Sequence, residues 1–213
     1  MKQSFIIKRQ SSRLLLFFAG WGMDEAPFAD FYPEDADFMI CYDYRTFDFD
    51  ETQISGYSSI TLIAWSMGVY AAAHTLQNSD LPIDKRIAVN GTIEPVSNDK
   101  GIPPAVYQLT LDTLSERSIQ KFRLRMCGSG TLYSDFMQHA PNRPIEELKD
   151  ELVHIRETSL QNPHPSFQWD VAVIGLKDVI FPPDNQRNAW KGIQQRIEKE
   201  MAHYDYLERW IKN

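Results

Sequence analysis

The sequence predicts an α/β fold, in which a mostly parallel central sheet is flanked by helices and carries an inserted helical cap. Short apolar runs alternate with helical patterns, and the run at residues 14–18 is nearly all apolar, as expected for a strand buried on both faces. Strands separated by helices indicate crossover connections, which build a parallel sheet. Six strands are predicted, at residues 4–7, 14–18, 38–42, 60–64, 86–90 and 171–175.

The composition is that of one globular domain covering residues 1–213. The chain has 22 Lys and Arg against 29 Asp and Glu, a net charge of −7, so no nucleic-acid partner is expected. No run approaches the roughly 18 apolar residues of a membrane span, so no membrane partner is expected either. Cys41 and Cys127 share no metal-ligand spacing with a histidine. The expectation is a cytoplasmic monomer without a metal.

A helical insertion is predicted at about residues 102–165, because this stretch has helix-like segments and no convincing strand. The helix candidates are residues 104–114, 115–126 and 144–158, and Cys127-Gly128-Ser129-Gly130 marks a break between two of them. An all-helical insertion between two strands is typical of a cap over the end of a sheet. The alternative is that these helices cover one face of the sheet.

The pentapeptide Ala64-Trp65-Ser66-Met67-Gly68 matches the small-x-Ser-x-small pattern of a nucleophile elbow, with Ala in place of the usual first Gly. It lies between an apolar strand and a helical pattern, as the motif requires. The outer positions must be small because strand and helix backbones approach closely at this strained turn. Ser66 is therefore the candidate nucleophile, and the alternative is a structural turn serine.

A serine nucleophile needs a base, and the partners are expected in the order acid, then histidine. Asp178 follows the strand at 171–175 and is the candidate acid, whereas His203 near the end of the chain is the candidate base. Loops after parallel strands open on one edge of the sheet, where these side chains can meet Ser66. Glu94 is the competing acid. The remaining histidines lie in the elbow helix or in or beside the cap and are discounted: His74, His139, His154 and His164.

Two backbone amides are the expected donors to an oxyanion. Met67 follows the candidate nucleophile at the start of a helix. Trp21 lies in a glycine-rich loop at residues 18–23, the usual place of the second donor. The Trp21 indole is expected to form one wall of an acyl pocket. A tight strand-to-helix turn is the structural alternative for the loop glycines and is compatible with this function.

These motifs resemble those of the BioG family of α/β-hydrolases. The resemblance rests, in chain order, on Phe18-Ala19-Gly20-Trp21-Gly22-Met23-Asp24, Ala64-Trp65-Ser66-Met67-Gly68, Gly175-Leu176-Lys177-Asp178-Val179-Ile180-Phe181-Pro182 and His203-Tyr204. It covers nearly the whole chain, although the cap matches only by position and helical character. The family comprises pimeloyl-acyl-carrier-protein methyl ester esterases of biotin synthesis. Because the same triad serves hydrolases of many esters, the substrate is what the resemblance implies.

The resemblance also implies a mechanism. Ser66 attacks the methyl ester of the pimeloyl chain while His203 accepts its proton and Asp178 orients the imidazole. The amides of Trp21 and Met67 bind the oxyanion. Methanol leaves, and water then releases pimeloyl-acyl carrier protein with its thioester intact. No cofactor is required, since phosphopantetheine arrives as part of the substrate.

The implied partner, an acyl-carrier protein, is acidic like this chain, so a local basic surface is needed. Arg117, Lys121 and Arg125 are spaced by four residues and form one basic stripe on a helix, with Arg123 beside it and Arg143 further along. The stripe is the candidate docking surface for the carrier. The alternative is an ordinary solvated helix face.

Other interpretations stay open. The triad equally suits a thioesterase or a general short-chain carboxylesterase, and a hydrolase-fold protein can also serve only as a binding protein that uses its cap. Several apolar cap residues are candidates to line a channel for the pimeloyl chain, with plain helix packing as the alternative: Phe122, Met126, Tyr133, Phe136 and Met137.

Overall fold

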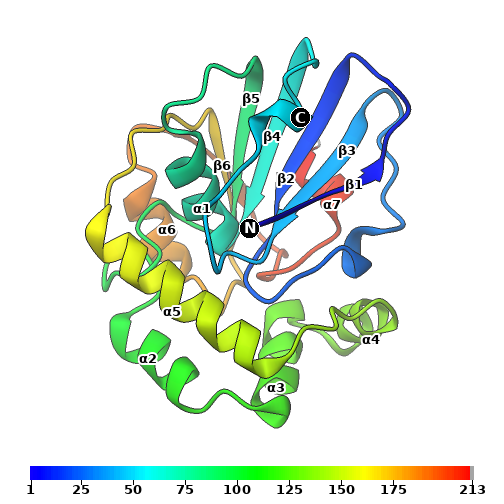
Figure 1. The fold of residues 1–213 in the computed structure, drawn as a ribbon. Coiled ribbons are helices and arrows are strands. Elements are labelled where there is room, and N and C mark those ends of the chain that lie inside the picture. Colours follow the sequence, from blue (N-terminus) through cyan, green and yellow to red (C-terminus); the bar gives the residue numbers. More distant parts are fainter. Residues whose placement is uncertain (212–213) are drawn as a thin grey trace.

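A single sheet forms the centre of the computed structural model, which describes residues 1–211 (Figure 1). Its strands are β1 Lys2–Ile7, β2 Arg13–Phe18, β3 Asp37–Tyr42, β4 Ser59–Trp65, β5 Ile83–Val89, β6 Val171–Gly175 and β7 Gln194–Glu198. The seven strands have the order β1-β3-β2-β4-β5-β6-β7. β1 pairs with β3 antiparallel and the other pairings are parallel, which confirms the predicted mostly parallel sheet.

All six predicted strands are present, but β5 begins at Ile83, earlier than predicted, and β7 is an additional strand. β7 has the sequence Gln-Gln-Arg-Ile-Glu, is partly exposed along its length and pairs only with β6 at the edge of the sheet. An edge strand of this kind needs no apolar run. The apolar pattern that identifies buried strands therefore does not reveal it.

Helices cover the sheet and one of its ends. Helix α1 spans Met67–Leu76, α6 Pro183–Ala189 and α7 Leu207–Ile211, and short 3-10 turns span Ala26–Phe28 (η1) and Glu51–Gln53 (η2). Between β5 and β6 lie α2 Pro104–Asp112, α3 Glu116–Cys127, α4 Gly130–Gln138 and α5 Ile145–Gln161. We call residues 104–161 the cap; its four helices lie together beyond one end of the strands (Figure 1). Within residues 1–211, no helix combines the length and apolar character needed to cross a bilayer.

The cap contains one helix more than the candidates taken from the sequence. Helix α3 ends at Cys127 and is followed by Gly128, whose φ of 68° is the left-handed conformation that glycine adopts readily, so the predicted break is present. The Ser129 side chain then accepts a hydrogen bond from the Leu132 N–H and begins α4. The break is thus a sharp turn between two helices.

Two apolar cores pack on opposite faces of the sheet. Along β2, Leu14, Leu16 and Phe18 belong to one core, and Leu15 and Phe17 belong to the other. Helix α1 contributes to the first core and α7 to the second. Because side chains alternate between the faces of a strand, a nearly all-apolar strand indicates burial on both sides. The central strands are therefore buried on both faces up to the loops at their ends.

Candidate active site

Ser66 occupies a sharp turn between β4 and α1. Its φ of 60° and ψ of −127° form a combination that residues with a side chain rarely adopt. A Cβ atom on Gly68 would lie 2.3 Å from the Phe18 carbonyl oxygen, and one on Gly91 would lie 2.2 Å from the Ser66 carbonyl oxygen. Both glycines therefore permit close backbone approach. The turn has the strained form predicted for a nucleophile elbow.

The side chains of Ser66, His203 and Asp178 form one hydrogen-bonded row. His203 Nε2 lies 2.9 Å from Ser66 Oγ, and His203 Nδ1 lies 2.9 Å from Asp178 Oδ2. All three residues are at most 5% exposed. When Nδ1–H donates to the carboxylate, Nε2 is free to accept the serine proton. This is the geometry that general-base activation of a serine needs.

Hydrogen bonds on both carboxylate oxygens fix the orientation of Asp178. The backbone N–H groups of Ile180 and Phe181 donate to Oδ1 at 2.8 and 2.9 Å, and Gln186 Nε2 donates to Oδ2 at 3.0 Å. The Phe181 ring also stacks on the His203 ring, with centroids 5.9 Å apart. The loop after β6 therefore positions both the carboxylate and one face of the imidazole.

The competing candidates have other partners. Glu94, the alternative acid, pairs with Lys100 at 2.7 Å, whereas the Asp178 carboxylate contacts the imidazole of the row. His74 and His154 both pack against the Phe47 ring, with centroids 4.8 and 5.1 Å apart. Of the acids and histidines considered from the sequence, the structure brings only Asp178 and His203 to Ser66 within residues 1–211.

Asn90, which the sequence analysis did not single out, anchors the loop that bears His203. Its buried side-chain NH₂ donates to the carbonyls of Ala202 and His203 at 2.7 and 2.9 Å, and its Oδ1 accepts from the Gly175 N–H at 2.8 Å. Asn90 also has a φ of 44°, which asparagine tolerates better than most residues. A polar residue at the end of an apolar strand was the only sequence signal.

Trp21 and Met67, the candidate oxyanion donors, both line a pocket that also contains Ser66. Within the described chain, no protein acceptor bonds either backbone N–H. The Trp21 indole N–H donates to the Leu148 carbonyl at 2.8 Å, which orients the ring. The ring also packs edge to face on the ring of Phe122, another residue that lines the pocket, with centroids 5.1 Å apart.

The pocket lies between the sheet edge and the cap. Its lining is largely apolar on the cap side, with contributions from α2, α3 and α5: Val106, Tyr107, Thr110, Phe122, Met126 and Leu152. These helices therefore cover the edge of the sheet that carries Ser66. Two of the five candidate channel residues, Phe122 and Met126, line the pocket. The other three, Tyr133, Phe136 and Met137, pack in the core on one sheet face, as the alternative held.

The basic stripe is exposed along α3, as its spacing predicts. Arg117, Lys121 and Arg125 are all exposed, and Arg125 also lines the pocket above Ser66. A capping box formed by Ser115 and Ser118 begins this helix. The stripe therefore leads along the cap to the entrance of the pocket.

Two further arginines were wrongly associated with this stripe. Arg123 is 6% exposed and donates to the Pro141 carbonyl at 2.9 Å. The Arg143 side chain is 4% exposed and pairs with Asp43 at 2.9 Å and Glu151 at 2.7 Å. Both guanidinium groups turn into the protein because buried acceptors from distant segments bind them.

Within residues 1–211, no group of three or more His, Cys, Asp or Glu side chains is arranged to bind a metal ion. Cys41 and Cys127 are buried and form no disulfide. Burial raises the pKa of the Cys41 thiol far above its ordinary value.

The sheet order, the strained serine turn and the helical cap define an α/β-hydrolase fold. The fold is shared with an esterase from Exiguobacterium antarcticum, with a TM-score of 0.69 and 18% identity over 98% of this chain and 90% of that chain. The chain belongs to the BioG family: the family model described as "Pimeloyl-ACP methyl esterase BioG" matches residues 1–211.

Two relatives are more similar in sequence. The crystal structure of BioG from Haemophilus influenzae superposes with a TM-score of 0.87 at 35% identity, covering 99% of this chain and 96% of that chain. A protein of Bacteroides fragilis named "Malonyl-[acyl-carrier protein] O-methyltransferase" is 51% identical over 192 residues, which are 90% of this chain and 39% of that protein. This chain thus spans well under half of the Bacteroides relative.

Proposed function

We propose that this chain is a serine esterase that hydrolyses the methyl ester of pimeloyl-[acyl-carrier protein] methyl ester, giving pimeloyl-[acyl-carrier protein] and methanol in biotin synthesis. The observation that carries the proposal is the hydrogen-bonded row of Ser66, His203 and Asp178 beside a pocket, in a member of the BioG family. The row supplies the chemistry of ester hydrolysis, and the family description supplies the substrate.

In the first half of the reaction, Ser66 Oγ attacks the ester carbonyl carbon while His203 Nε2 takes the hydroxyl proton. Asp178 stabilises the imidazolium that forms. The tetrahedral intermediate then collapses, the bond to the methoxy oxygen breaks, and the imidazolium gives its proton to the departing methanol. The pimeloyl group remains on the serine as an acyl-enzyme.

In the second half, water attacks the acyl-enzyme while His203 Nε2 accepts a water proton. Collapse of this second intermediate returns the proton to Ser66 Oγ and releases the free carboxylate. The thioester to the carrier lies at the other end of the pimeloyl chain and is not involved. The product is pimeloyl-[acyl-carrier protein].

The oxyanion of both intermediates is assigned to the backbone N–H groups of Trp21 and Met67. Both residues line the pocket beside Ser66, and both amides are available. Met67 is also the first residue of α1, where the helix dipole favours negative charge. Loss of one such donor typically costs a factor of about 100 to 1,000 in kcat.

The carrier is assigned to the basic stripe on α3. Arg117, Lys121 and Arg125 are exposed, and the pocket lining reaches Arg125. Val106 and Val179 also line the pocket, and each is at least half exposed. These two side chains give the pocket entrance an apolar rim. A carrier bound on the stripe can therefore pass its acyl chain across the apolar rim toward Ser66.

The name of the Bacteroides fragilis relative fits this assignment. That name describes methyl transfer to a carrier-bound acid, and this chain matches 39% of that protein. Methyl transfer to a carboxylate oxygen makes a methyl ester, which is the bond that a serine esterase breaks. We therefore assign the hydrolytic step to this chain.

The test is methanol release from carrier-linked pimeloyl methyl ester, with free thiol measured in the same reaction. We expect methanol without free thiol, and no methanol from the Ser66→Ala variant. Asp178→Ala should lose most of the activity, while Glu94→Ala, the matched change at the competing acid, should retain it. Free thiol without methanol would instead identify a thioesterase. A folded protein whose Ser66 does not react with a fluorophosphonate would be a binding protein.

A further inference from the structure

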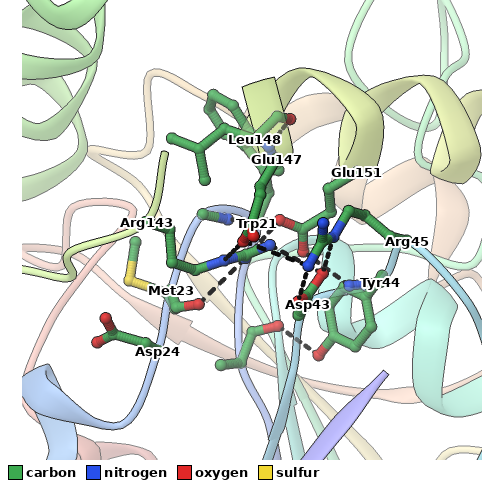
Figure 2. A network of polar contacts seen from close by, with 12 residues as sticks. Trp21, Met23, Asp24, Asp43, Tyr44, Arg45, Arg143, Glu147, Leu148 and Glu151 are labelled. Atoms are coloured by element: carbon green, nitrogen blue, oxygen red, sulfur yellow. Dashed lines mark hydrogen bonds and ion pairs between the residues drawn. The ribbon is translucent and has the colours of Figure 1, made fainter. Parts of the chain in front are cut away.

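The loop at residues 19–24, which carries Trp21, is bonded to the cap by a buried polar network (Figure 2). The Gly22 backbone N–H donates to Glu151 Oε2 at 3.3 Å. The Trp21 indole donates to the Leu148 carbonyl at 2.8 Å, one turn before Glu151 on α5. Helix α5 therefore accepts hydrogen bonds from two groups of the loop, the Gly22 backbone N–H and the Trp21 indole N–H.

Arg143 completes the attachment on the cap side. Its Nη1 donates to Glu151 Oε2 at 2.7 Å and to the Met23 carbonyl at 3.3 Å. Its Nη2 lies 2.9 Å from Asp43 Oδ1, at the end of β3. Figure 2 shows the Arg143 guanidinium between the carboxylates of Asp43, Glu147 and Glu151. The guanidinium thus joins the loop, the cap and the sheet edge.

Tyr44 bonds the same loop from the sheet side. Its hydroxyl donates to the Ala19 carbonyl at 2.7 Å, and its backbone N–H donates to Glu151 Oε1 at 3.0 Å. The two oxygens of Glu151 therefore accept from different segments, Oε1 from Tyr44 and Oε2 from Gly22. Tyr44 thus bonds the start of the loop at Ala19, and Glu151 bonds it further along at Gly22. Because Glu151 also bonds Tyr44, it links these two points of attachment.

Burying the Glu151 carboxylate costs desolvation free energy, so stability of the fold does not explain this arrangement. Glu151 is 0% exposed, and burial raises its pKa, although the Arg143 charge opposes that effect. A buried ion pair seldom stabilises a fold more than apolar residues of the same volume. Gly22 has a φ of 74°, so this part of the loop has the conformational freedom of glycine and depends on outside bonds for its path. Glu151 supplies one of these bonds.

We propose that Glu151, supported by Arg143, is a positioning residue that sets the path of the 19–24 loop and so aims the Trp21 backbone N–H at the oxyanion. This inference rests on the proposed function, because it assigns Glu151 to the same site. Glu151 acts through Gly22 and does not itself touch the substrate. The cap therefore shapes the oxyanion site as well as the pocket.

The test is the isosteric Glu151→Gln variant, assayed with p-nitrophenyl butyrate and with a boronic acid that mimics the tetrahedral intermediate. The amide keeps the shape but replaces one acceptor oxygen with a donor. Either Tyr44 loses its bond to Glu151, or Gly22 and Arg143 both lose theirs. We expect kcat to fall about tenfold to 100-fold, less than for complete loss of an oxyanion donor, with KM changed less than about threefold. The affinity for the boronic acid should fall by the same factor as kcat/KM.

The boronic acid distinguishes positioning from a loss of folded protein. A smaller folded fraction lowers kcat but leaves the affinity of the folded molecules for the boronic acid unchanged. Glu146→Gln is the matched control, because it is the same substitution at an exposed position of α5, and it should behave like wild type. Wild-type boronic acid affinity in folded Glu151→Gln would overturn the proposal.

A second variant covers the case in which Glu151→Gln does not fold. Tyr44→Phe removes only the hydroxyl, which bonds the carbonyls of Ala19 and Cys41, and we expect a smaller loss of boronic acid affinity, about threefold to tenfold. Unchanged affinity in Tyr44→Phe would then overturn the proposal.

The small ester keeps this test separate from the proposed substrate. A wild-type protein that hydrolyses p-nitrophenyl butyrate but releases no methanol from the carrier-linked ester would refute the substrate alone. The comparison of variants would still decide the role of Glu151. A wild-type protein that neither hydrolyses the small ester nor reacts with a fluorophosphonate would overturn both proposals.

Discussion

The Trp65 indole N–H donates a 2.8 Å hydrogen bond to the backbone carbonyl of His203. Trp65 is the residue before Ser66 and is 1% exposed, and its ring also packs 5.4 Å from the His203 ring between centroids. The last residue of β4 thus holds the loop of the candidate base beside the candidate nucleophile. Trp65 occupies a position that the elbow pattern leaves open to any residue, and here its side chain positions the His203 loop.

Replacing Trp65 with Phe should therefore lower kcat more than the same replacement at Trp169. The variant keeps an aromatic ring but removes one of the donors to the His203 carbonyl, which should cost about 1 kcal/mol of stability and shift the imidazole. Trp169→Phe is the matched control, since Trp169 is buried and its indole N–H has no hydrogen-bond partner within the described chain. Equal kcat values for the two variants would argue against the role of this bond.

Asn90→Ala should be both less stable and less active than wild type. It removes one donor to the Ala202 carbonyl, one of the donors to the His203 carbonyl and the acceptor of the Gly175 N–H. Each group left buried and unpaired costs about 1 to 3 kcal/mol. Thermal unfolding and kcat measure the two effects. Asn90→Gly separates bonding from backbone strain, because glycine tolerates the φ of 44°. A wild-type-like Asn90→Gly would show that strain alone matters.

Gly68→Ala should disrupt the turn that presents Ser66. The added Cβ would lie 2.3 Å from the Phe18 carbonyl oxygen and 2.5 Å from that of Ala19, so the backbone must shift. Overpacking of this kind typically costs about 1 to 3 kcal/mol or more, and a fluorophosphonate should label Ser66 much more slowly. Gly130→Ala is the control, since no heavy atom lies within 4 Å of its added Cβ. Equal labelling rates in the two variants would contradict the close packing.

Asp43 should make the stability of the protein depend on acidic pH. Burial acts to raise the pKa of Asp43, but the hydrogen bond from Arg45 and the charge of Arg143 lower it to about 2. An unfolded Asp has a pKa near about 3.9, so this stabilisation is fully present above about pH 4 and is lost as the pH falls toward 2.

Asp43→Asn should remove that dependence and lower the free energy of unfolding at pH 7, by on the order of 2 kcal/mol. Denaturant unfolding between pH 2 and pH 7 measures both changes. Asp48→Asn, at an exposed position, is expected to follow the wild-type curve. An unchanged slope in Asp43→Asn between pH 4 and pH 2 would exclude Asp43 as its source.

Charge reversal of Arg117, Lys121 and Arg125 to Glu should raise KM for the carrier-linked substrate about tenfold or more, because repulsion slows association with an acidic carrier. The effect should shrink at high salt. Because Arg125 lines the pocket, the small-ester comparison uses the Arg117→Glu, Lys121→Glu double variant, in which hydrolysis of p-nitrophenyl butyrate should change little. Equal effects on both substrates would rule out docking on the stripe. The control reverses three exposed cations around the start of β2, at the opposite end of the sheet from Ser66: Lys8, Arg9 and Arg13.

Local patterns were enough to predict the parts of the fold that are buried on both sides. The residues of β2 and β4 are apolar because both faces of the central sheet are covered, so the pattern and the burial have the same cause. The turn at Ser66 was predicted because its small neighbours are a local steric requirement. Chain order then selected Asp178 and His203, and the structure places His203 beside Ser66 and Asp178 beside His203.

Other features depend on partners that the local sequence does not contain. Arg143 was expected near an exposed stripe, but Asp43 and Glu151 bind it inside the protein. Glu151 itself lies in a helix whose charges predict a solvated surface, and its burial follows from donors in two distant loops. A charged side chain is buried only where such partners surround it.

The amino-acid sequence by itself determined the parallel sheet, the strained serine turn and the order of the three reactive side chains, because local sterics and burial on both faces dictate them. Only the tertiary structure decided that Asn90 and Trp65 support the His203 loop and that Glu151 bonds the loop of Trp21. These hydrogen bonds join segments far apart in the chain, and their geometry exists only after the sheet and the cap have packed together.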